Sequence, residues 1–231
     1  MIKFRVGTKD VLKSVAQVIV VSPKNNKEDL NLPKGVVQKI EKHIKDKENG
    51  FFTLYDNDTI RLVAVYAKDE SEVVNDSEEL RLFGAAVYKA LETEKVEEAQ
   101  LAGFNEAFST CERSLFLEGM SLAQYRFVKY KKKKTEPSLK IVYMDEESVV
   151  ADEIVALGNL VKAVSFAKDL VNEPVNYLDA PKFSELALEM ASACGFTTEV
   201  LDKAKIEELK MGGLLAVNQG STTPPTFNIF T

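Results

Sequence analysis

Apolar residues recur at steps of three and four along residues 152–172, which predicts a long helix with one broad apolar side. The apolar positions are Ile154, Leu157, Leu160, Val161, Val164, Ala167, Leu170 and Val171. We expect the helix to end near Asn172, because Pro174 lacks an amide hydrogen and disfavours helical angles at Glu173. By periodicity alone, such a helix most often packs against a core.

Before this helix, β-branched runs alternate with amphipathic segments. The runs predict strands at 2–6, 15–22, 51–55, 60–67, 99–102 and 139–144, and the helical patterns fall at 35–45, 77–91 and 107–125. Asp56–Asp58 is a plausible hairpin turn between two of the strands. The alternation predicts an α/β domain over residues 1–150, with helices packed on a mixed sheet.

After residue 174 the alternation starts again. Asp179 and Gly195 are placed to begin and end a helix over 181–194, and Asp202 to cap a helix that reaches about Lys210. We predict strands at 197–201, at Leu214–Val217 and at 227–230. About 50 residues of this kind lie near the lower limit for burying a core alone.

The small size of this last segment predicts uncovered apolar surface, which promotes association. The residues concerned include Leu214, Leu215, Val217, Phe227 and Phe230. We expect another copy of the chain to cover them, or the segment to pack back on the helix of residues 152–172.

Composition narrows the class of protein without identifying it. The 231 residues are 45% hydrophobic and 29% charged with a net charge of −6, as in soluble globular proteins of one or two domains. No apolar run approaches the roughly 20 residues of a membrane span, so no membrane partner is expected. The absence of a secretory signal pattern and the distant Cys111 and Cys194 predict semi-buried, reduced thiols and a cytoplasmic location.

The residues alone indicate no catalytic, metal-binding or cofactor-binding site. His43 is the only histidine and lies among lysines on a predicted helix, so we interpret it as a solvated side chain. HExxH, CxxC, P-loop and GxGxxG patterns are absent from the sequence. The paired carboxylates fall in charged surface contexts.

A basic run over residues 125–134 leaves two interpretations open. Lys131, Lys132, Lys133 and Lys134 follow interleaved aromatic residues, a combination typical of single-stranded nucleic-acid surfaces. The alternative is a helix end followed by a solvated loop. We favour the loop, because no glycine-aromatic RNA motif accompanies the lysines.

Three blocks resemble the leucyl aminopeptidase family (peptidase family M17), the dinuclear-metal cytosol aminopeptidases. The first is EGMSLAQYRFVKYKKKK at residues 118–134, and the second is AKDLVNEPVNYL at 167–178. The third is KIEELKMGGLLAVNQGSTTPPTF at 205–227. The blocks occur in the family's order, and the lysine run lies inside one of them.

The resemblance implies a macro-domain-like N-terminal domain at 1–150, a linker helix at 151–173 and the start of a catalytic domain at 174–231. For a complete protein it implies two divalent metals (Zn or Mn), a peptide substrate that loses its N-terminal residue, and a homo-oligomer, in this family a hexamer.

The family's metal ligands and catalytic groups follow the PPxF block, and the sequence ends at Thr231 before any of them. We therefore expect this chain alone to be inactive. Two alternatives remain, a nucleotide-binding or nucleic-acid-binding module and a non-catalytic assembly module. The glycines of residues 1–150 are isolated, which weakens the first, because macro-like pockets use glycine-rich loops.

Overall fold

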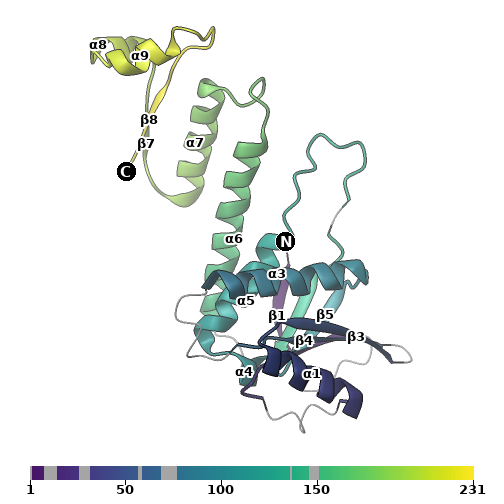
Figure 1. The fold of residues 1–231 in the computed structure, drawn as a ribbon. Coiled ribbons are helices and arrows are strands. Elements are labelled where there is room, and N and C mark those ends of the chain that lie inside the picture. Colours follow the sequence, from purple (N-terminus) through teal and green to yellow (C-terminus); the bar gives the residue numbers. More distant parts are fainter. Residues whose placement is uncertain are drawn as a thin grey trace. The chain divides into compact units, whose positions relative to one another are not determined.

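A computed structural model describes residues 2–7, 15–25, 32–56, 59–68, 77–135, 137–145 and 151–231. The chain divides into two compact units, residues 1–166 (unit 1) and 167–231 (unit 2) (Figure 1). The division falls inside helix α6 (Ala151–Asn172), which is the long helix that the apolar spacing predicts.

Unit 1 is built on a six-stranded sheet with the order β1-β6-β5-β2-β4-β3. β3 is antiparallel to β4 and the other neighbouring strands are parallel, which confirms the predicted mixed sheet and α/β class. The strands are β1 (Lys3–Gly7), β2 (Ala16–Val21), β3 (Gly50–Asp56), β4 (Thr59–Val65), β5 (Glu98–Ala102) and β6 (Ile141–Asp145).

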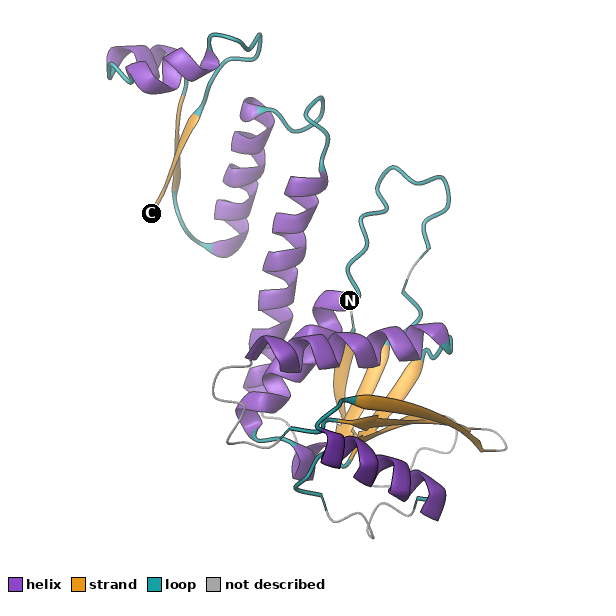
Figure 2. Cartoon of the chain, in the orientation of Figure 1, coloured by secondary structure: helices purple, strands orange, loops and turns teal. Residues whose placement is uncertain are grey.

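Helices cover both faces of this sheet, and the alternation along β2 shows how (Figure 2). Ile19 and Val21 pack with Ile40 of α1 (Lys34–Asp46) on one face. Val18 and Val20 belong to the core on the opposite face, beneath α3 (Ser77–Thr93), α5 (Thr110–Ala123) and the first turns of α6. Successive side chains of a strand point to opposite faces, so a strand buried on both is apolar throughout.

Helices α3 and α5 approach each other closely because each carries a glycine at their contact. A Cβ added to Gly84 would lie 2.1 Å from the carbonyl oxygen of Phe116, and one added to Gly119 would lie 2.0 Å from that of Arg81. Arg81 Nε donates to Glu118 Oε1 at 2.9 Å across the same pair of helices. The isolated glycines of unit 1 thus include two that serve helix packing.

Unit 2 consists of the end of α6 followed by three short helices and one strand pair. β7 (Thr198–Leu201) and β8 (Phe227–Phe230) are antiparallel. The helices are α7 (Ala180–Cys194), α8 (Lys203–Glu208) and α9 (Gly212–Asn218). The predicted caps are confirmed, since Asp179 and Asp202 accept from the amides of Lys182 and Lys205, each at 2.9 Å, and Gly195 ends α7 with φ 79°.

The structure corrects two element predictions. Leu214–Val217 was expected as a strand and lies in helix α9, because Leu-Leu-Ala favours a helix and only Val217 is β-branched. The helix expected over 107–125 begins at Thr110, after the short α4 (Phe104–Ala107). Ser109 and Glu112 form a capping box that fixes this later start.

Three further expectations concern the hairpin turn, the cysteines and membrane-spanning helices. Residues 57 and 58 of the predicted hairpin turn lie outside the described residues. Cys111 and Cys194 form no disulfide, and both are exposed rather than semi-buried. In the described part of the chain, the helices lack the combination of length and apolar character that crossing a bilayer requires.

Candidate functional site

The second resemblance block forms the end of α6 and a tight connection to α7. Asn172 Nδ2 donates to the carbonyl of Lys168 at 2.8 Å within the last helical turn. The carbonyl of Pro174 then accepts from the amides of Tyr177 and Leu178 at 2.9 and 3.0 Å. This turn, made where proline stops the helix, brings the chain to Asp179, the cap of α7.

The third block is attached to the beginning of α7 through one threonine. Thr226 Oγ1 donates to the carbonyl of Ala180 at 3.1 Å and lies 2.9 Å from Ser184 Oγ, which donates to it. The third block is therefore held at the first turn of α7, which directly follows the second block, and β8 starts at the next residue. This arrangement sets the direction in which the chain leaves the PPTF sequence.

Unit 2 exposes large apolar side chains around this framework. Val171, Val175 and Val217 have exposed fractions of 84%, 84% and 87%, and Phe230 is 47% exposed. The buried apolar residues of the unit are Ala187, Ala191, Leu201, Ile206 and Pro225. Val217, Phe227 and Phe230 are exposed as expected, whereas Leu214 and Leu215 are half-buried. The covering of this surface by a second copy or by the linker helix stays a prediction.

The lysine run lies in the loop between α5 and β6, and Lys131, Lys132, Lys133 and Lys134 are all exposed. The neighbouring aromatic rings are engaged, since Phe127 and Tyr130 pack at 5.9 Å between centroids and Lys129 Nζ lies 5.5 Å from the Tyr130 centroid. The four lysines are exposed and Tyr130 is 57% exposed, so the nucleic-acid interpretation of the run stays a prediction.

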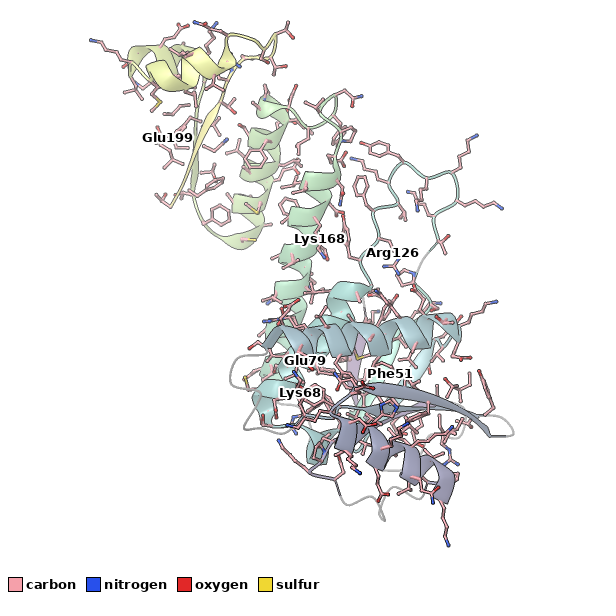
Figure 3. The ribbon with its side chains drawn as sticks, viewed as in Figure 1. Phe51, Lys68, Glu79, Arg126, Lys168 and Glu199 are labelled. Atoms are coloured by element: carbon pink, nitrogen blue, oxygen red, sulfur yellow. The ribbon has the colours of Figure 1, made fainter. Side chains whose placement is uncertain are left out.

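The base of this loop is tied to α3 through Arg126 (Figure 3). Arg126 Nη2 contacts both carboxylate oxygens of Glu92, at 3.1 and 2.9 Å, and Tyr88 Oη donates to the same carboxylate at 3.1 Å. Burial, then the charge and hydrogen bond of Glu92, raise the pKa of Tyr88 to about 12, against an opposing effect of Arg126. Arg126 therefore anchors the start of this loop to α3.

His43 is half-buried rather than fully solvated. Its Nδ1 lies 2.9 Å from the carbonyl of Glu48, and its ring packs edge-on against Phe52 at 5.3 Å. A Cβ on Gly50 would lie 2.6 Å from the ring, so glycine makes room for the imidazole. The sole histidine joins helix α1 to strand β3.

Sequence reasoning missed a polar cluster where the parallel strands β2 and β5 end. Asn25 Oδ1 accepts from the amide of Ser22 at 2.6 Å, and Asn25 Nδ2 donates to the carbonyl of Gly103 at 3.3 Å. Lys24 pairs with Glu112 at 3.5 Å, and Glu112 also accepts from the amide of Ser109 at 2.7 Å. The one sequence signal was the Ser-x-x-Glu spacing of the capping box.

Such an edge is where open α/β sheets commonly bind ligands, but here the polar groups bind each other. Burial by itself raises the pKa of Glu112, and hydrogen bonds from Ser109 with the charge of Lys24 outweigh it and hold the pKa below 4.5. The cluster therefore stabilises the edge and leaves few groups for a ligand.

The resemblance implies two metal ions for a complete protein, so the described residues were compared with what such a site requires. Within the described ranges, His, Cys, Asp and Glu side chains do not assemble into a group of three able to hold a metal ion. The described residues thus do not fit a dinuclear centre, and we assign no metal ligand to them.

Residues 165–231 match the model of the cytosol aminopeptidase family, catalytic domain. A probable cytosol aminopeptidase of Sulfurihydrogenibium is 32% identical over 178 residues, which cover 75% of this chain and 32% of that protein. Over these residues the chain is similar to the cytosol aminopeptidase family. It spans about a third of the length of this curated relative.

Solved structures show the same fold at low sequence identity. A tomato leucine aminopeptidase mutant matches 99% of this chain with a TM-score of 0.75 and 15% identity, and the match covers 50% of the tomato chain. The bottromycin maturation enzyme BotP, in complex with Mn, matches 94% of this chain with a TM-score of 0.69 and 18% identity, and 45% of the BotP chain is covered. Both likenesses support the α/β fold of the aminopeptidase relatives.

Proposed function

We propose that this chain supplies the N-terminal domain, the linker helix and the first catalytic segment of a metal-dependent aminopeptidase that removes N-terminal residues from peptides. The observation that carries the proposal is the match of residues 165–231 to the family's catalytic domain. The proposed division is 1–150, 151–173 and 174–231.

The metal part of the proposal concerns the whole enzyme. Two divalent ions, Zn or Mn, would supply an activated water and a polarised carbonyl, and the Mn named for BotP supports this metal class. We assign no step of the reaction to described residues of this chain. Their part is structural. The Thr226 contacts hold the PPTF sequence against the first turn of α7 and so set where the following strand begins.

Intact mass and hydrolysis together test this proposal. We expect the native product to have about twice the 25.7 kDa of this chain, because the chain aligns with 50% of the tomato enzyme. We expect that product to hydrolyse leucine p-nitroanilide with added Mn²⁺ or Zn²⁺ and to lose activity with a chelator. A native product of 25.7 kDa without hydrolysis would refute the proposal.

The 231-residue chain, prepared alone, is the matched control for that measurement. We expect it to show no metal-dependent hydrolysis, because its described residues hold no metal-ligand cluster. Activity in this preparation would show that the catalytic groups lie within these 231 residues, contrary to the proposal.

We further propose a cytoplasmic homo-oligomer, in line with the hexamer that the resemblance implies. The relatives' cytosol aminopeptidase names and the exposed apolar residues of unit 2 support this proposal. Light scattering on the native product checks it, and a monomer at micromolar concentration would contradict it.

A further inference from the structure

A cavity of about 340 Å³ in unit 1 lies apart from the polar cluster, and Ser121 is the one described lining residue that belongs to a resemblance block. It lies along β1, the last strand at its end of the sheet, beside α5 and α6. Its volume is within the range of about 300–1,000 Å³ that is typical of small-molecule sites. Ten described residues line it.

The interior of the cavity is apolar. Ile2 and Val161 are 5% and 3% exposed, and Leu157 and Ile154 add aliphatic surface from the same side of α6. Ser121 is the one neutral polar side chain among the described lining residues, and it already donates its hydroxyl to the carbonyl of Leu117 at 2.8 Å. An apolar molecule could therefore enter without removing a hydrogen-bond partner from the protein.

The charged groups among the ten described lining residues all have the same sign. They are Lys3 and Arg5 on β1 and Lys162 on α6, and none of the ten lining residues is acidic. All three are exposed, so their charged ends can remain in water while their stems border the opening. This is unusual for a chain with a net charge of −6, and it favours an anion over a cation.

A glycine in the middle of α6 helps to form the cavity. Gly158 lines it, and a Cβ added at this position would meet nothing within 4 Å. Helix packing therefore does not require glycine here, in contrast to Gly84 and Gly119. Glycine inside a helix is also less favourable than alanine. The missing side chain leaves room beside α6 at this cost to the helix.

We infer that this cavity binds a small apolar molecule bearing one negative charge, of the alkyl-carboxylate class. The alkyl part contacts Ile2, Leu157 and Val161, and the carboxylate remains at the opening beside the cations. The inference concerns unit 1 alone and does not depend on the proposed peptidase activity.

Decanoate is the probe, and calorimetry on the 231-residue chain measures its binding. We expect binding at one site, with amide chemical-shift changes in β1 and around Gly158. Decyltrimethylammonium has an alkyl chain one carbon longer and the opposite charge, and it should still bind at least about tenfold more weakly. Equal binding of the two probes, or shift changes confined to other elements, would overturn the inference.

Gly158→Leu fills the space that the missing side chain leaves and should weaken decanoate binding at least about tenfold. It should leave the fold intact, because the site has open space and leucine favours a helix. Gly35→Leu is the matched control, since Gly35 lies on α1 with nothing within 4 Å of an added Cβ and does not line the cavity. Equal effects of the two variants, or no effect of Gly158→Leu, would contradict the site.

Lys162→Ala separates the charge contribution from the apolar contribution. Loss of one exposed ion contact should weaken decanoate binding about two- to fivefold and leave decanol binding unchanged. Equal weakening of both probes would show that the cations do not select the ligand, which would refute the carboxylate assignment.

Discussion

Unit 1 and unit 2 differ in how completely each buries its own apolar residues. In unit 1, helices cover both faces of the sheet, and β2 and β4 contain residues with no exposed surface, such as Val20 and Val63. Unit 2 buries Leu201 and Ile206 but leaves Val171 and Val217 more than four-fifths exposed. Unit 1 has the features of an independently folding domain, whereas the stability of unit 2 depends on what covers it.

Amide hydrogen exchange is the sharpest test of this difference. In the isolated chain we expect amides of β2 and β4 to exchange at least about a hundredfold more slowly than those of β7 and β8, because opening unit 2 exposes little buried apolar surface. Mass spectrometry of peptic fragments measures both sets in one sample. Equal protection in the two units would show that unit 2 is as stable as unit 1 in the isolated chain.

A change at the helix contact of unit 1 should have the next largest effect. Gly84→Ala places a methyl group against the backbone of Phe116, so we expect the free energy of unfolding of unit 1 to fall by about 1–3 kcal/mol. Urea unfolding followed by circular dichroism measures it, and exchange in β7 should not change. Gly35→Ala, in open space, is the control and should shift stability by less than about 1 kcal/mol. An unchanged unfolding midpoint for Gly84→Ala would show that α3 and α5 separate easily.

Within unit 2, the Thr226 contacts allow a smaller and more local test. Thr226→Val removes the hydroxyl that joins the PPTF sequence to α7, and we expect a local loss of about 1 kcal/mol. Exchange in the first turn of α7 should become faster, while the urea midpoint of unit 1 stays constant. Thr222→Val, at an exposed position of the same loop, is the control. A changed midpoint for unit 1 would mean that the units unfold together.

The smallest expected effect is a pH dependence confined to unit 1. The pKa of Glu112 is lowered in the folded state, so its contribution to stability is present above pH 4.5 and is lost as the pH falls through the folded pKa. Glu112→Gln should therefore reduce the loss of stability between neutral and acidic pH. Ser109→Ala, which removes a hydroxyl donor to this carboxylate, should shift the profile in the same direction. An identical pH profile for wild type and Glu112→Gln would contradict this origin.

The sequence predicted most elements because their signals are local. The caps at Asp179 and Asp202 and the left-handed end at Gly195 each depend on a few neighbouring residues. Leu214–Val217 failed because a four-residue apolar run fits either a strand or a helix, and periodicity cannot decide over so short a length.

The strand order and the cavity could not be predicted in the same way. Lys3 and Lys162 come together because β1 takes the edge of the sheet beside β6, a pairing between segments more than 130 residues apart. Gly158 looks like any other helical glycine until its surroundings are known. The role of Gly84 and Gly119 could not be predicted either, because the sequence does not show which helices contact each other.

The α3–α5 contact has a consequence for tolerated variation. Glycine is the only residue without a Cβ, so every missense change at codons 84 and 119 inserts an atom within about 2 Å of a backbone oxygen. In a saturation library, both positions should be depleted of all nineteen substitutes regardless of polarity or charge. Positions 35 and 158 should accept many of them. The four glycines can therefore serve as internal controls for how strongly such a library is selected for folding.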